Sequence, residues 1–207
     1  MGIGDPYVTL PAFKEYINVK PGTISLDQTA QMAIEAASQE VEKITNRQFN
    51  KAEVATARLY RPERCGEAVL VDDFYTTTGL LVEINTSGTT WVTVPPSDYE
   101  LEPENGIVDG QPGWPFWGIR RISGLRYPVH HWDGRKSTVR VTAKWGWESI
   151  PGPVRQACLI MASEAFNMKD APFGVAGMDM WGPVRVRDNR VALSKLARYT
   201  RDKLLVG

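Results

Sequence analysis

The residues of this chain best suited to metal chemistry lie close together near position 130. His130, His131 and Asp133 supply three potential ligands within four residues, and on a strand His131 and Asp133 would point to the same side. The neighbouring Trp132 and Gly134 are typical of a loop or hairpin tip, and no fourth Cys, His or carboxylate stands at a motif-like spacing. We therefore expect no metal site and no bound cofactor.

Other patterns of catalytic chemistry are incomplete. Gly174, Gly177 and Gly182 suggest a phosphate-binding loop, but no Gly-Lys-Ser/Thr follows and no βαβ unit precedes them. The pair Asp72-Asp73 is better explained as a solvated turn than as an acid-base pair. The sequence contains no Gly-x-Ser-x-Gly, His-Glu-x-x-His or Cys-x-x-Cys. We expect a protein that is not an enzyme.

A block of aromatic and basic residues spans positions 111 to 146. Such a surface could bind single-stranded nucleic acid, because bases stack on aromatic rings and cations neutralise phosphates. The alternative is that these tryptophans fill the core or subunit contacts, since each buries a large area. The residues concerned are Trp114, Trp117, Trp132, Arg120, Arg121, Arg126 and Arg135.

The elements that must position these side chains are of two kinds. Apolar residues at helical spacing predict helices at about 26–46, 153–168 and 188–205, the last beginning at Asp188. Between the first two, short β-prone runs predict six or seven strands. No helical pattern separates these runs, so the strands should be mostly antiparallel. We predict an α+β fold, a helical core with an inserted antiparallel β-sandwich or small barrel.

The domain limits follow from this pattern. Residues 1–52 and 146–207 form the predicted helical core with an N-terminal arm, and residues 53–145 form the inserted β subdomain. The 207 residues are 43% hydrophobic and 23% charged, which is typical of a globular protein. No leader and no apolar run of about 20 residues occurs, so we expect a soluble protein outside the membrane. Cys65 and Cys158 should be free thiols, with Cys158 buried on a helix.

Charge is sorted along a chain whose formal net charge is zero. Residues 50–110 carry four basic and eleven acidic groups, whereas residues 111–146 carry seven basic and one acidic. Residues 184–207 carry seven basic and two acidic groups. Either the blocks neutralise each other within one folded unit, or the acidic surface of one subunit meets the basic surface of the next, as in a head-to-tail ring.

The stretch from 146 to 186 carries a set of short motifs. It contains a Gly-aromatic pair, then Ile-Pro-x-x-Val and an alanine-bearing helix, then a loop of glycines and large apolar residues. In this chain the motifs read Gly146-Trp147, Ile150-Pro151-Gly152-Pro153-Val154, Ala171-Pro172-Phe173-Gly174-Val175-Ala176-Gly177 and Gly182-Pro183-Val184-Arg185-Val186. This stretch resembles the head-to-tail adaptor (connector) proteins of tailed bacteriophages.

The resemblance implies a structural virion protein of the head-tail neck, made in the cytoplasm of a bacterial host. Proteins of that family form a ring, generally of twelve subunits, between the portal and a tail-side connector or stopper protein. Genomic DNA then passes through the channel without being a specific ligand. The alternative is a nucleic-acid-binding module that uses the 111–146 block, and a metal-dependent enzyme at His130, His131 and Asp133 is a more distant one.

Three sets of residues are candidate contacts with other subunits or partners. The first lies in the loop from Phe173 to Pro183, which either inserts into a neighbouring subunit or folds back over its own helix. The second lies on the last helix, and the third consists of arginines in the basic block. The candidates are Phe173, Met178, Met180 and Trp181 in the loop, Arg190, Leu193, Leu196, Arg198 and Tyr199 in the helix, and Arg120, Arg121 and Arg126 in the block.

Overall fold

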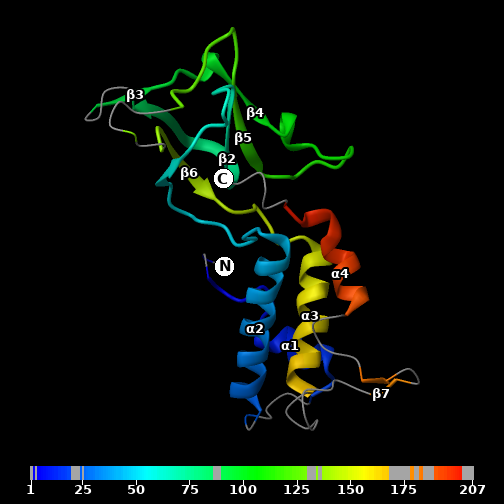
Figure 1. Ribbon diagram of the computed structural model, residues 1–207. Helices are drawn as coiled ribbons and strands as arrows, with labels where there is room; N and C mark the ends of the chain where they lie inside the picture. Colours follow the sequence, from blue (N-terminus) through cyan, green and yellow to red (C-terminus); the bar gives the residue numbers. More distant parts are fainter. Residues whose placement is uncertain are drawn as a thin grey trace. The chain divides into compact units, whose positions relative to one another are not determined.

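The contacts within the chain divide it into two compact units (Figure 1). The helical unit comprises Ile3–Phe49 and Ile150–Arg201, and the β unit comprises Asn50–Ser149. The computed structural model describes residues 2, 4–19, 24, 26–85, 90–129, 134, 137–167, 178–179, 182–183 and 189–201. The domain limits inferred from the sequence stay a prediction.

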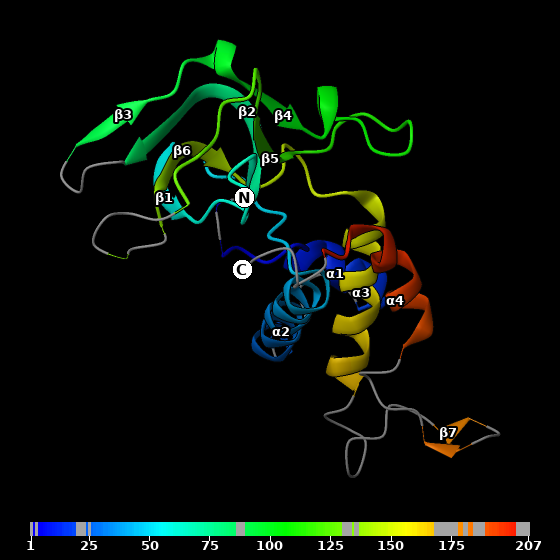
Figure 2. The same cartoon turned by 45° about the horizontal axis from the view of Figure 1, so that its top comes forward.

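The helical unit is built around a central helix that contacts the three others. Helix α3 (Gly152–Asn167) lies between α2 (Asp27–Thr45) and α4 (Arg190–Leu196), and α1 (Leu10–Tyr16) contacts α2 and α3 (Figures 1 and 2). The predicted limits of α2 and α3 are therefore confirmed within one residue. Among the described residues, no helix has the length and apolarity needed to cross a bilayer.

The N-terminal segment is part of this helical core. The side chains of Tyr7 and Phe13 are buried, and the Tyr7 hydroxyl donates to Glu42 Oε1 at 2.7 Å and accepts from the Phe49 amide at 3.1 Å. The Tyr7 amide in turn donates to Ser38 Oγ at 3.0 Å. These hydrogen bonds fix the N-terminal arm to α2 and to the segment after it, although the bonded residues are more than 30 positions apart in the sequence.

The last helix is shorter than predicted and starts later. The Asn189 side chain accepts hydrogen bonds from the amides of Val191 and Ala192, at 2.9 and 3.0 Å, so Asn189 and not Asp188 caps the helix. Helix α4 ends at Leu196 and continues as a 3₁₀ turn to Tyr199. The prediction of a helix to 205 is wrong because the chain is already extended at Thr200.

The β unit contains one open antiparallel sheet in the strand order β1-β6-β2-β5-β4, with β3 also paired to β2 (Figure 2). The strands are β1 (Thr56–Tyr60), β2 (Ala68–Asn85), β3 (Trp91–Thr93), β4 (Tyr99–Glu102), β5 (Phe116–Arg121) and β6 (Val139–Trp145). The predicted α+β class is confirmed. Over the part of the β unit that the structure describes, the sheet forms neither the predicted sandwich nor a closed barrel, because β1 and β4 are not paired to each other.

Strand β2 contains two apolar runs, which the polar residues 76–78 separate in the sequence. Its first part pairs with β5 and its second part with β6 and β3. The register shifts between Thr76 and Leu81, where Gly79 has a positive φ of 82°. A glycine tolerates this backbone and lets the long strand bend without ending.

One face of this sheet forms the core of the β unit. Along β6 every second residue is buried, so that Val139, Val141, Ala143 and Trp145 lie on the inner face. This alternation is expected for a sheet with one buried face and one solvent-exposed face. The core residues of the unit are Val69, Val71, Phe74, Val82, Val94, Ile119, Tyr127, Val139, Val141, Ala143 and Trp145.

Candidate interaction surfaces

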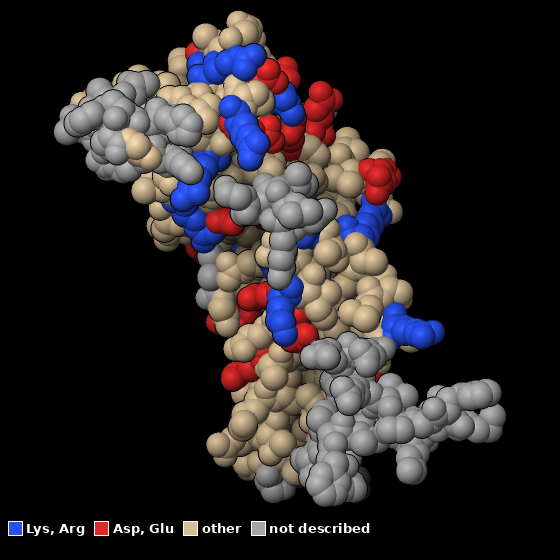
Figure 3. Space-filling view, in the orientation of Figure 1, with Lys and Arg blue, Asp and Glu red and all other residues tan. Residues whose placement is uncertain are grey.

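Two arginines of the basic block pair with acidic residues of the same chain. Arg120 Nε donates to Glu102 Oε1 at 2.6 Å, between the adjacent strands β5 and β4. Arg126 donates to Glu67 Oε1 at 3.0 Å and to the Cys65 carbonyl at 2.7 Å. Figure 3 shows acidic and basic side chains next to each other on the β unit. For these arginines the structure favours neutralisation within one subunit.

Arg121 is held inside the β unit. Only 8% of its side chain is exposed, its Nη2 lies 3.8 Å from Asp98 Oδ2, and its guanidinium lies 5.6 Å from the centre of the Tyr127 ring. Burial raises the pKa of Tyr127, against the effect of the nearby Arg121. Arg121 therefore packs in the interior of the β unit.

The tryptophans of the block do not form an open stacking platform within the described residues. Trp114 is 8% exposed, and its ring centroid lies 6.0 Å from that of Trp117 and 5.0 Å from that of Trp147. A buried ring cannot stack on a base, so the core alternative accounts for Trp114. Trp132 and Arg135 lie outside the described residues, as do His130, His131 and Asp133.

The Gly146-Trp147 pair has a structural explanation. Gly146 has a φ of 98° and its amide donates to the Asp73 carbonyl at 2.6 Å. A Cβ at position 146 would lie 1.7 Å from the Asn50 carbonyl oxygen, so only glycine fits. The indole N–H of Trp147 donates to the buried Asp73 carboxylate at 2.9 Å. The pair thus closes the end of the β unit.

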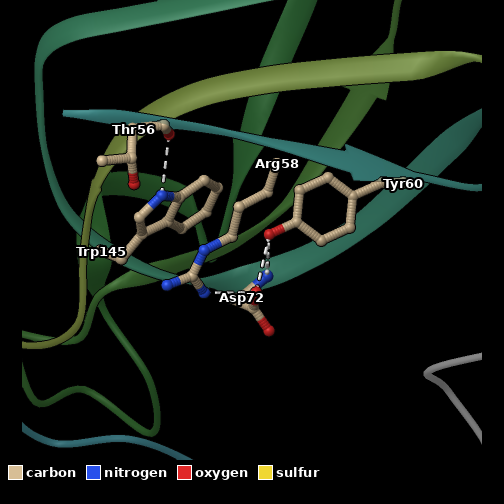
Figure 4. Close-up of polar contacts among 5 residues, drawn as sticks. All are labelled: Thr56, Arg58, Tyr60, Asp72 and Trp145. Atoms are coloured by element: carbon tan, nitrogen blue, oxygen red, sulfur yellow. Dashed lines mark hydrogen bonds and ion pairs between the residues drawn. The ribbon is translucent and has the colours of Figure 1, made fainter. Parts of the chain in front are cut away.

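A polar cluster fixes edge strand β1 to the sheet (Figure 4). Arg58 donates to Asp72 Oδ2 at 2.6 Å and lies over the Trp145 ring at 4.6 Å, and Tyr60 donates to the same carboxylate oxygen at 2.8 Å. The Trp145 indole donates to the Thr56 carbonyl at 2.9 Å. Burial and then the Asp72 charge raise the pKa of Tyr60.

A second cluster lies on the other face of the sheet. Arg140 makes two bonds to the Glu83 carboxylate, at 2.6 and 2.7 Å, and its guanidinium lies 4.5 Å from the centre of the Trp91 ring. Neither cluster is predicted by the sequence. No local signal identifies them, because Arg140 and Glu83 are 57 positions apart and become neighbours only through the pairing of β2 with β6.

The candidate residues of the last helix divide between core and surface. Leu196 is completely buried in the helical unit, and Tyr199 packs edge-to-face on Phe49 with a centroid distance of 6.0 Å. Arg190 and Arg198 are exposed. Leu196 is therefore corrected from a contact residue to a core residue of its own subunit.

The loop candidates lie largely outside the described residues. This holds for Phe173, Met180, Trp181 and the side chain of Met178. The backbone forms a small hairpin in which β7 (Met178–Asp179) pairs with β8 (Gly182–Pro183).

The predicted free thiols are confirmed. Cys65 is exposed and Cys158 is buried on α3, where its sulfur lies 3.5 Å from Ser38 Oγ. Burial raises the pKa of Cys158 to about 11. A thiol in this state is a poor nucleophile. Among the described residues no group of three His, Cys, Asp or Glu side chains could hold a metal ion.

Comparison with known proteins gives a likeness of structure only. No protein-family model matches the chain, and no curated protein matches its sequence. A chain in the neck of an empty gene transfer agent (GTA) particle, computed with C6 symmetry, is similar in structure with a TM-score of 0.57 and 16% identity, covering 95% of this chain and 91% of that one. A chain of the virion of a native GTA particle has a TM-score of 0.56 and 13% identity over the same shares of both chains. At these identities the likeness establishes the fold.

Proposed function

We propose that this protein is a structural component of the neck of a phage-like particle, a head-to-tail adaptor that forms a ring between the portal and a tail-side connector or stopper. The observation that carries the proposal is the shared fold with a GTA neck chain over nearly the full length of both proteins. The motifs from Gly146 to Val186, which resemble phage adaptors, point to the same role from the sequence.

The proposed ring has twelve subunits with DNA passing through its centre. The neck that this chain resembles was computed with C6 symmetry, and a twelvefold ring contains sixfold symmetry. Zero net charge suits a channel through which DNA moves, because a strongly basic protein would hold the phosphates. The described arginines of the basic block are paired within the chain, which supports the same point.

The contacts of the ring are part of the proposal. We propose that the loop around β7 and β8, with Phe173, Met180 and Trp181, inserts into a neighbouring subunit. Large side chains in a glycine-containing loop are suited to such a contact. We propose that α4 and the 3₁₀ turn after it contact the portal or a neighbour through their exposed residues, among them Arg190 in the helix and Arg198 in the turn.

The test is native mass spectrometry of the chain with and without the portal protein of the same particle. Twelve chains of 23.1 kDa give a ring of about 277 kDa, which should add to the mass of the portal as one unit. A chain that stays monomeric with portal present, and binds single-stranded DNA with a strong dependence on salt, would support the nucleic-acid-binding alternative instead.

A further inference from the structure

Among the described residues, the sheet of the β unit has three strands with a free edge, and two of them are protected. Strand β3 has only three residues and is soon followed by Pro95-Pro96. Strand β4 carries two glutamates and is flanked by 3₁₀ turns on both sides. Short length, proline and charge are the usual means of preventing a further strand from pairing. These edges are therefore poor acceptors.

Strand β1 has none of these protections. Its sequence, Thr-Ala-Arg-Leu-Tyr, contains no proline or glycine, and its single charge, Arg58, is neutralised by Asp72. Leu59 is 58% exposed and lies opposite Arg140 of β6. Among the described residues β6 is the only strand that pairs with β1. Alternate residues of β1 therefore direct their N–H and C=O groups away from β6, to a side where no described strand pairs with them.

The edge is also held in place before any partner binds. The cluster in Figure 4 ties β1 to β2 through Arg58, Tyr60 and Asp72, and to β6 through Trp145. A strand fixed in this way loses little conformational entropy when a further strand is added. Extended backbone is the ligand that such an edge recognises.

A suitable donor is present elsewhere in the same sequence. The β7–β8 hairpin belongs to the helical unit and, within the described residues, pairs with no other strand. In β8 Pro183 lacks an N–H, so the hairpin must join a sheet through β7. The segment Gly177–Gly182 carries one charge, Asp179, and is otherwise apolar or glycine. This composition suits the β1 edge, whose single charge is already paired with Asp72 and which carries the exposed Leu59.

We propose that β7 of one copy adds to the β1 edge of the next copy and so extends its sheet. The inference rests on the proposed ring, because a head-to-tail ring needs two different surfaces on each subunit that fit each other. Here β1 is the acceptor and the β7–β8 hairpin is the donor. Backbone bonds give the contact its direction, and Leu59 gives it an apolar centre.

The test uses two chains, each with one new cysteine, in a Cys65→Ser background. Leu59→Cys and Met178→Cys chains are mixed, assembled on the portal and treated with a short bis-maleimide cross-linker that tolerates a small shift in register. We expect a cross-linked dimer in denaturing gels from this mixture. The matched control replaces Leu59→Cys by Glu100→Cys on the protected edge β4, and should give at least tenfold less dimer.

The outcomes separate the two proposals. If rings bind to the portal but the Leu59→Cys and Met178→Cys chains are not linked, or are linked no better than the β4 control, the β1 contact is wrong and the adaptor proposal stands. A dimer from Leu59→Cys chains alone would also overturn it, because it indicates pairing of β1 with β1. If no ring forms with the portal, both proposals fall.

A charge placed on the edge gives a second readout. Leu59→Lys should weaken ring formation at least tenfold while thermal melting of the monomer stays within about 2 °C, because the side chain is already exposed. Val54→Lys is the control, since Val54 is 72% exposed and lies just outside β1. Equal assembly of the Leu59→Lys and unmodified chains would contradict the proposal.

Discussion

The residue on which the β unit depends most sharply is Gly146. We predict that Gly146→Ala lowers the free energy of unfolding by at least about 3 kcal/mol, because the new methyl group would overlap the Asn50 carbonyl and the backbone is in the left-handed region. Urea denaturation followed by tryptophan fluorescence measures the change.

Gly113→Ala is the matched control for backbone strain. Gly113 has a φ of 89°, close to that of Gly146, but a Cβ there would meet nothing within 4 Å. This variant should cost only about 1 kcal/mol. Equal losses for the two glycines would show that the overlap with Asn50 does not matter.

The two cysteines should differ in reactivity. We predict that a thiol reagent at pH 8 modifies Cys65 within seconds and Cys158 at least about a hundredfold more slowly, because Cys158 is buried and burial raises its pKa to about 11. Mass spectrometry of timed samples gives both rates. In a Cys65→Ser chain the fast phase should vanish, and a fast phase that persists would contradict the buried position of Cys158.

Single residues can be predicted from the sequence where they have a strong local signature. Contacts between residues that meet only in the fold cannot be predicted in this way. Gly146-Trp147 is recognisable because both residues are adjacent and unusual. The Arg58–Asp72 and Arg140–Glu83 pairs have no such signal, since the register of β1, β2 and β6 brings them together. For Trp114 the sequence leaves a surface and a core position open, and its burial agrees with the core alternative.

At the scale of the secondary-structure elements, the stability of the junction between α3 and α4 should depend on pH. The Glu164 carboxylate accepts a hydrogen bond from Asn189, the cap of α4. Burial raises the pKa of Glu164, more than this bond lowers it. The folded chain therefore holds the Glu164 proton at a higher pH than the unfolded chain, so stability from this group is present below pH 4.5 and is lost as pH rises through the folded pKa.

Glu164→Gln tests this directly, because the amide oxygen can still accept from Asn189. We predict that the variant gains stability relative to the unmodified chain as pH rises from about 4.5 to 7. Urea denaturation at several pH values measures the difference. Glu35→Gln, at an exposed position of α2, is the control. A difference that stays constant over this range would contradict the raised pKa.

The elements themselves were predictable where periodicity was long. The spacing of apolar residues predicted both ends of α2 and of α3 to within one residue. Strand β4 alternates Tyr99 and Leu101 with two glutamates, but over only four residues, which is too short a pattern to predict a strand. Strand β2 is longer than the apolar runs of its sequence indicate, because the polar residues Thr76, Thr77 and Thr78 interrupt its apolar pattern. The end of α4 was overestimated because apolar residues continue beyond Leu196 although the helix does not.

At the scale of the whole molecule, the charge blocks allow a test of where neutralisation occurs. We predict that a chain with Arg120→Glu and Glu102→Arg exchanged forms rings on the portal at the same salt concentration as the unmodified chain, because this pair lies within one subunit. Exposed pairs contribute at most about 1 kcal/mol, so monomer stability should change little. Native mass spectrometry at increasing salt measures the rings.

The single substitution Arg120→Glu is the control for the exchange, since it breaks the pair without restoring it. If the exchanged chain loses rings as severely as the single variant, Arg120 contacts the acidic surface of a neighbour instead. That result would restore, for Arg120, the charge-matching contact that the sequence suggests.

The central claim is that this chain forms part of the neck, and its position in a particle tests that claim most directly. Particles from cells that encode the chain with an affinity tag inserted next to exposed Gly110 can be labelled with gold and viewed by electron microscopy. The account predicts label at the junction of head and tail, in nearly every labelled particle. Label spread over heads or along tails, or particles that form with normal necks and contain none of the chain, would contradict it.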